Sequence, residues 1–224
     1  MAKNQQNQSA NNVGEAVSRT EAYIEKNKKK LTIAIVGIIV VIAAIWLVND
    51  YVIRPRQEKA MAALSAGEKY FRAGDYESAL NGDNYEYEGF EAVIKKFGCT
   101  KAANLAKAYA GLSLAQQGNS EDAVKFLKGF KGKDSMIAPA VQGALASCYA
   151  KNGNLDAAAK AFMKAVAKAD NNLLSPAYLV QAGQIFEQLG NNSAALKAYK
   201  QVKDKYYQSS QASDIDKYIE KVSK

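Results

Sequence analysis

Four short stretches of the sequence decide the fold: "RAGDYESAL" (72–80), "QQGNSEDAV" (116–124), "KNGNLDAAA" (151–159) and "QLGNNSAAL" (188–196). Each contains a glycine, an Asp or Asn directly after it, and an alanine five residues after the glycine. Glycine ends a helix well because it adopts left-handed backbone without a Cβ clash, and Asp and Asn are favoured helix N-caps. The four stretches therefore predict the turns of four helix–turn–helix units.

The residues around these turns repeat as well. Seven residues before each turn glycine stands a small residue, and nine residues after three of them stands a large one, namely Gly67, Gly111, Ala146 and Gly183 for the small set and Leu127, Phe162 and Tyr199 for the large set. These spacings resemble the tetratricopeptide repeat, a unit of two helices and about 34 residues. The resemblance covers roughly residues 60–207 and implies an all-α solenoid of about four repeats.

The first repeat departs from this pattern. Asp83 stands where a large residue is expected, and Phe90 supplies the large residue seven positions late. The segment "NGDNYEYEG" (81–89) is therefore predicted to be a loop inserted within or beside the second helix of this repeat, since Asn-Gly and Gly-Asp pairs favour loops. Its two tyrosines, Tyr85 and Tyr87, either contact a partner or pack on the repeat itself.

The chain after residue 212 is predicted to form a capping helix. Ile215, Ile219 and Val222 would form one apolar stripe on it. Solenoids need such a helix to cover the exposed apolar face of the last repeat. The repeat domain with its capping helix is expected to span residues 60–224.

An apolar run near the N-terminus predicts a membrane anchor. Leu31–Val48 contains 18 residues without a charge, which as a helix would be about 27 Å long, close to the hydrocarbon thickness of a bilayer. The run is longer than the apolar region of a signal peptide and lacks the small-residue cleavage pattern. We expect a polar, mostly disordered cytoplasmic tail at 1–30, a transmembrane helix at 31–50 and a linker at 51–59.

The flanking charges predict the orientation of this helix. Lys26, Lys28, Lys29 and Lys30 precede the apolar run, whereas Arg54, Arg56 and Lys59 follow it at wider spacing. Basic residues are retained on the cytoplasmic side of a membrane. The N-terminus is therefore expected in the cytoplasm, and the repeat domain outside it, which in a bacterium is the periplasm.

The composition argues against catalysis. The sequence has no histidine, which removes the commonest general base and metal ligand. No nucleotide-binding or nucleophile motif is present, so we expect no enzyme, no cofactor and no metal. Cys99 and Cys148 lie too far apart in the predicted repeats to form a disulfide. The net charge is +8, but no cluster of aromatic and basic residues accompanies it, so nucleic acid is not an expected partner. The second helices carry rows of lysines, such as Lys160, Lys164 and Lys168, which we interpret as a solvated outer face.

A tetratricopeptide array is expected to present a concave groove lined by its first helices. By the repeat alignment the groove residues are Leu105, Ala108, Tyr109, Leu112, Ala140, Gly143, Ala144, Ser147, Ala177, Val180, Gln181 and Gln184. The centre of this set is apolar and would suit an apolar helix or an unfolded segment. The alternative is that its large side chains simply pack on neighbouring helices. The lysine-and-asparagine clamp of repeat proteins that hold acidic chaperone tails is missing.

The whole layout, from "TEAYIEKNKKKL" (20–31) through one span and a short linker to four repeats, resembles the YfgM-type ancillary subunits of the bacterial Sec translocon. The "ALNGDNYEYEGF" insertion resembles the Bacteroidota branch of that family. The resemblance implies a protein of the bacterial inner membrane that binds the SecY, SecE and SecG channel and a PpiD-like chaperone, and that assists unfolded clients emerging from translocation. The alternatives are a cytosol-facing anchored receptor and an assembly factor for another envelope complex.

Overall fold

The computed structural model describes the backbone of residues 2–83 and 85–224, with side chains from Glu25 onward. All regular structure in these described residues is helical. The chain divides into two compact units, an N-terminal unit (Met1–Pro55) and a repeat unit (Arg56–Lys224). Each unit is described by itself.

The N-terminal unit is helical throughout its described backbone. It contains α1 (Ala2–Val48), a π-helical turn η1 (Asn49–Ile53) and the first residues of α2 (Arg54–Arg72). From Thr32 to Val48 every side chain is exposed, and this stretch forms part of a helix long and apolar enough to cross a membrane. A bilayer would cover such side chains, because the apolar stretch is close in length to the hydrocarbon thickness.

The polar residues before Leu31 have helical backbone within α1, whereas the sequence predicts a mostly disordered tail. A polar helix without a packing partner is only marginally stable in water. Disorder of this tail in solution, and the proposed boundaries at residues 30, 50 and 59, stay predictions.

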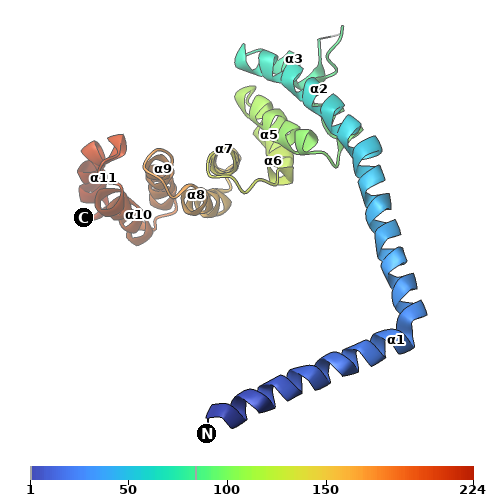
Figure 1. The fold of residues 1–224 in the computed structure, drawn as a ribbon. Coiled ribbons are helices and arrows are strands. Elements are labelled where there is room, and N and C mark those ends of the chain that lie inside the picture. Colours follow the sequence, from blue (N-terminus) through green and yellow to red (C-terminus); the bar gives the residue numbers. More distant parts are fainter. Residues whose placement is uncertain (1, 84) are drawn as a thin grey trace. The chain divides into compact units, whose positions relative to one another are not determined.

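The repeat unit consists of helices that pair in chain order. After α2 its elements are α3 (Tyr76–Asn81), α4 (Gly89–Phe97), α5 (Lys101–Gln116), α6 (Ser120–Gly129), α7 (Ile137–Lys151), α8 (Leu155–Ala169), α9 (Ser175–Gln188), α10 (Asn192–Lys205), η2 (Ser210–Asp214) and α11 (Ile215–Val222). Helix α5 packs on α6, α7 on α8 and α9 on α10, and each pair packs on the next (Figure 1). This is the all-α solenoid of stacked helix pairs that the sequence predicts.

The turns within the repeats form as the sequence predicts. The four turn glycines have positive φ angles, at Gly74 (79°), Gly118 (87°), Gly153 (75°) and Gly190 (70°). The residue after each glycine caps the next helix, because its side-chain oxygen accepts a hydrogen bond from a backbone N–H three residues on, as Asp75, Asn119, Asn154 and Asn191 do. Each cap satisfies one of the free N–H groups at the helix start.

The close contact between the two helices of a repeat also follows the predicted spacing. A Cβ atom added to Gly111 would lie 2.6 Å from Cγ of Leu127, and one on Gly67 would lie 2.5 Å from a ring carbon of Phe90. Phe90 therefore replaces the missing large residue of the first repeat. The insertion separates α3 from α4, so of the two predicted positions it lies within the second helix.

The core runs along the whole repeat unit in three adjoining clusters, one over α2 to α7, one over α7 to α9 and one over α8 to α11. Helix α11 closes the last cluster with Ile215 and Val222, which are both buried, and with Ile219, which is partly buried. The predicted capping helix is thus confirmed.

Candidate protein-binding surface

The twelve predicted groove residues lie on α5, α7 and α9, but most are not free. Only Ala140, Gln181 and Gln184 are exposed, whereas Ala108 and Gly143 are fully buried. The other seven side chains are half-buried: Leu105, Tyr109, Leu112, Ala144, Ser147, Ala177 and Val180. The open part of this surface is therefore smaller and more polar than the sequence suggests.

Tyr109 shows why the second repeat offers little free surface. Its ring stacks on Phe90 with centroids 5.3 Å apart, and it meets the edge of Phe71 at 5.1 Å. Burial, together with Glu68, raises the pKa of its phenol. Leu105 and Leu112 pack against the same cluster. In the second repeat the large side chains therefore pack on neighbouring helices, as the alternative interpretation predicted, and they do not form an open apolar surface.

In the third repeat a tyrosine from the next repeat fills the groove. A Cβ atom on Gly143 would lie 2.4 Å from Cε1 of Tyr178, so the ring of Tyr178 covers this glycine. Tyr178 also lies 6.4 Å from Phe162, between ring centroids, and burial raises its pKa. Ser147 donates a hydrogen bond to the carbonyl of Gly143 at 3.1 Å.

The groove stays open on its side nearest the C-terminus. A hollow of about 440 Å³ lies beside Gln184 and is lined also by Glu187, Gln188, Tyr218 and Lys221. The last two come from α11, which sequence reasoning assigned only a capping role. Lys221 pairs with Glu187 at 2.5 Å, and the lowered pKa of Glu187 reflects opposing effects: burial raises it, while hydrogen bonds from Lys221 and Tyr199 lower it more.

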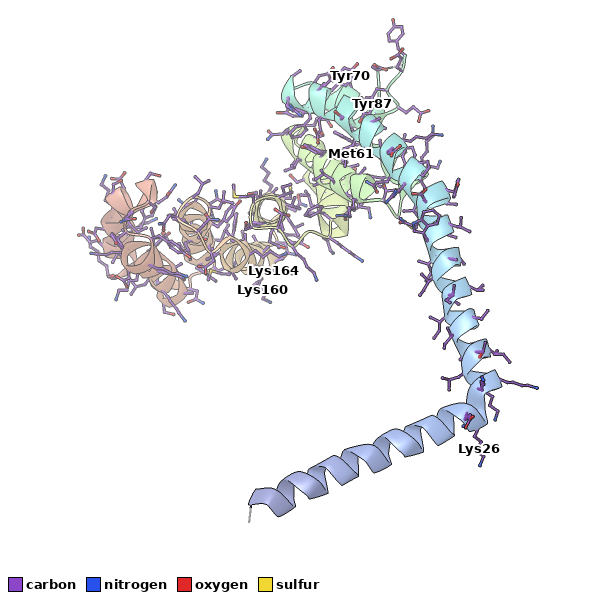
Figure 2. The ribbon with its side chains drawn as sticks, in the orientation of Figure 1. Lys26, Met61, Tyr70, Tyr87, Lys160 and Lys164 are labelled. Atoms are coloured by element: carbon purple, nitrogen blue, oxygen red, sulfur yellow. The ribbon has the colours of Figure 1, made fainter. Side chains whose placement is uncertain are left out.

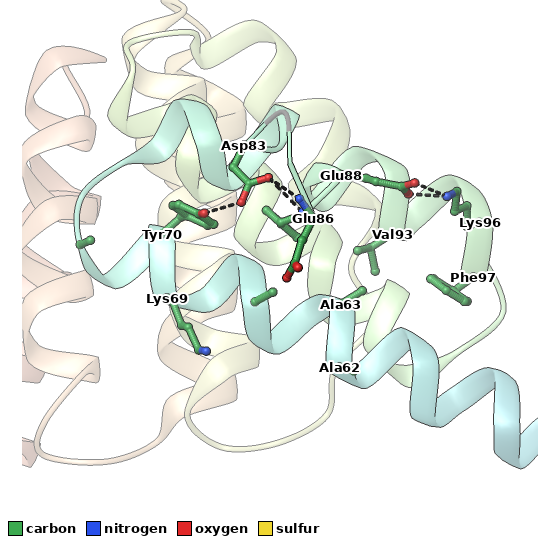
Figure 3. Close-up of a pocket in the computed structure, with 13 residues that line it drawn as sticks. Ala62, Ala63, Lys69, Tyr70, Asp83, Glu86, Glu88, Val93, Lys96 and Phe97 are labelled. Carbon is green, nitrogen blue, oxygen red and sulfur yellow. Dashed lines mark hydrogen bonds and ion pairs between the residues drawn. The ribbon is translucent and has the colours of Figure 1, made fainter.

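The insertion builds a second hollow, which the sequence did not predict. The end pocket, as we call it, has a volume of about 720 Å³ and lies between α2, loop residues 83 and 86–88, and α4. Its lining is Ala62, Ala63, Ala66, Lys69, Tyr70, Ala73, Asp83, Glu86, Tyr87, Glu88, Val93, Lys96 and Phe97 (Figure 3). The signal in the sequence was the insertion with its two tyrosines.

Asp83 fixes the loop that forms one wall of the end pocket. Its carboxylate accepts hydrogen bonds from the hydroxyl of Tyr70 at 2.6 Å and from the backbone N–H groups of Tyr85, Glu86 and Tyr87. The hydrogen bond from Tyr70, followed by those from the backbone, lowers the pKa of Asp83 to about 2.

The two tyrosines of the insertion have different surroundings. Tyr87 is buried: its ring stacks on that of Tyr70, and its hydroxyl donates to the carbonyl of Ala79 at 2.9 Å. Tyr85 is 93% exposed. Packing therefore explains Tyr87, while Tyr85 stays free for a partner.

The described residues were predicted to hold no metal and no disulfide between Cys99 and Cys148. They contain no group of three His, Cys, Asp or Glu side chains that could hold a metal ion. Cys99 is exposed and Cys148 is buried, both as free thiols. Lys160 and Lys164 are exposed along α8, in agreement with a solvated outer face (Figure 2).

Stacked helix pairs of this kind define a protein-interaction scaffold. In agreement with this class, residues 144–213 match the family model described as "Tetratricopeptide repeat". The chain is also similar to a solved structure titled "Crystal structure of MamA protein", with a TM-score of 0.55 and 19% identity over 74% of this chain and 90% of that one. At this identity the likeness concerns the fold alone. No curated protein matches the sequence.

Proposed function

We propose that this chain is an inner-membrane-anchored scaffold or co-chaperone of a bacterial Sec translocon, with its repeat unit in the periplasm. In this proposal it binds the SecY, SecE and SecG channel and a PpiD-like chaperone, and it assists proteins that emerge from translocation. The observation that carries the proposal is the combination of one membrane-length apolar helix, preceded by four lysines, with a repeat scaffold that follows it. The YfgM-like layout of the sequence supplies the identity of the partners.

The open part of the groove is the surface that we assign to these partners. Ala140, Gln181 and Gln184 are exposed there, and Gln184 also lines the hollow beside Tyr218 and Lys221. Half-buried apolar side chains such as Val180 add contact area next to them. A partner segment with both apolar and hydrogen-bonding groups would suit this mixed surface better than a purely apolar one.

Copurification tests the proposal. The full-length protein, extracted from bacterial membranes in mild detergent, should retain the three channel subunits and a membrane-anchored chaperone, identified by mass spectrometry. The same experiment with a variant that carries Ala140→Glu and Gln181→Glu should lose them. Retention of a different envelope complex would instead favour the assembly-factor alternative, and retention of cytosolic proteins would favour the receptor alternative.

A further inference from the structure

The outer face of α2 is bare, although the matching faces of the later repeats are covered. The positions of this face are counted from the small residue of each first helix, which is Gly67, Gly111, Ala146 or Gly183. The face consists of the residue five positions before it, the residue directly before it and the residue two positions after it. In the later repeats these positions are buried or half-buried, namely Ala106, Ala110 and Ser113, then Val141, Leu145 and Cys148, then Tyr178, Ala182 and Ile185. In the first repeat Ala62 and Lys69 are exposed and Ala66 is half-buried.

The cover of the later faces is the preceding repeat. Val141 and Leu145 of α7 belong to the same core cluster as Leu127 of α6. Ala182 of α9 likewise belongs to the cluster of Phe162 on α8. In both cases the second helix of one repeat packs on the first helix of the next. Helix α2 is the first helix of the repeat unit, so no preceding repeat covers its face.

The bare face of α2 opens into the end pocket. Figure 3 shows Ala62, Ala63 and Lys69 along α2, with Val93 and Phe97 of α4 across from them. The loop that Asp83 fixes forms a further wall, so the hollow exists without a ligand. A preformed site loses less conformational entropy on binding than a flexible one.

We propose that the end pocket binds one amphipathic α-helix of a partner protein, seated on α2 as α6 is seated on α7. The contact would continue the helix-on-helix interface that the chain already forms between its own repeats. The small alanines of α2 allow close approach, so the bound helix would present small or aliphatic residues at i, i+3 or i+4, and i+7.

The charges in the pocket specify the partner further. Lys69 occupies the position of Ser113, Cys148 and Ile185. Its ammonium group has no ion pair with any side chain that the structure describes, whereas Lys96 is paired with Glu88. The carboxylate of Glu86 is also exposed and unpaired among the described residues. The bound helix should therefore carry an acidic residue facing Lys69 and a basic one facing Glu86. Such pairs give specificity more than affinity.

The other end of the repeat unit argues against a second copy as the partner. End-to-end stacking of two copies would place the last helices of one against α2 of the next. Helix α11 already covers that end, with its own Ile215 and Val222 buried in the last core cluster. The end pocket is a surface distinct from the groove, and its binding of a partner helix is separate from the proposed function.

Site-specific photocrosslinking in membranes tests this inference. The full-length protein would carry p-benzoylphenylalanine at position 66 in the end pocket or, as a control, at Ala167, which is exposed on α8. We expect an adduct from position 66 alone, which mass spectrometry maps to an amphipathic helical segment of another protein. Crosslinking to a second copy, to a non-helical segment or equally from both positions would overturn the proposal.

The charge requirement has its own test. A synthetic peptide of the crosslinked segment should bind the purified full-length protein, and Lys69→Glu should weaken binding at least tenfold. Replacing the facing acidic residue of the peptide with Lys should restore it. Binding that ignores both changes would refute the assigned pairing and with it the seating on α2. The groove variant Ala140→Glu with Gln181→Glu should leave this binding intact, so a failure of the groove assignment can be told apart from a failure here.

Discussion

The ring of Tyr199 lies directly against the backbone of Gly183. A Cβ atom added to Gly183 would come within 2.3 Å of ring carbon Cε1, and the ring is completely buried. The hydroxyl of Tyr199 donates a hydrogen bond of 2.5 Å to Glu187, which also pairs with Lys221. This one contact therefore connects α9 with α10 and, through Glu187, with α11.

The first prediction concerns this contact. Gly183→Ala should destabilise the repeat unit by about 1–3 kcal/mol, because a buried and hydrogen-bonded ring cannot move away from the new methyl group. The better helix propensity of alanine, worth at most about 1 kcal/mol, offsets only part of this cost. Urea unfolding followed by circular dichroism measures the change. Gly98→Ala is the control, since the nearest atom to its added Cβ lies at 3.5 Å. Equal stability of both variants would contradict a locked ring.

The second prediction concerns pH. The folded-state pKa of Asp83, about 2, lies below its ordinary value of 3.8. A lowered pKa means that the ionised group stabilises the fold above about pH 4, and that this contribution is lost as the pH falls towards 2. Asp83→Asn should therefore lower the melting temperature at pH 7 and make it less sensitive to acid between pH 5 and 2.5.

Tyr70→Phe serves as the control for this pH effect. It removes the hydrogen bond that contributes most to the shift but keeps the carboxylate, so it should reduce the acid sensitivity only in part. Thermal melts of the three proteins across the pH range provide the comparison. Parallel pH profiles for parent and Asp83→Asn would show that Asp83 does not anchor the loop.

The fold could be predicted well from the sequence, because the turns and caps of the repeats are determined by residues close together in the chain. A positive φ at Gly118 and a cap at Asn119 depend only on a few adjacent residues, and the late position of Phe90 shows up as a break in spacing. The openness of the groove depends instead on side chains from the next repeat. Periodicity placed Gly143 on the inner face, but it could not show that Tyr178 reaches across to cover it. The exposure of the α2 face likewise could not be predicted from local spacing, because it depends on the absence of a preceding repeat that would cover it.

The third prediction concerns orientation. If the lysines before Leu31 hold the N-terminus in the cytoplasm, protease added to intact spheroplasts should degrade the repeat unit and spare an epitope on the tail. Changing Lys28, Lys29 and Lys30 to Gln leaves one nearby lysine against Arg54, Arg56 and Lys59. A fraction of the chains should then invert and protect the repeat unit. Full protection of the parent until lysis would show that the repeat unit faces the cytoplasm.

The fourth prediction concerns the groove. Glu substitutions at Ala140 and Gln181 should leave the melting temperature within about 2 °C of the parent, because both side chains are exposed and surface changes cost little. Retention of the membrane partners should fall at least tenfold, since a bound segment would desolvate two new carboxylates without pairing them. Leu112→Glu provides the contrast. That side chain packs on the core, so the variant should melt early even without any partner. If Ala140→Glu with Gln181→Glu melts normally and still retains every partner, the groove is not the binding surface, and exposed Tyr85 and the end pocket become the surfaces to vary next.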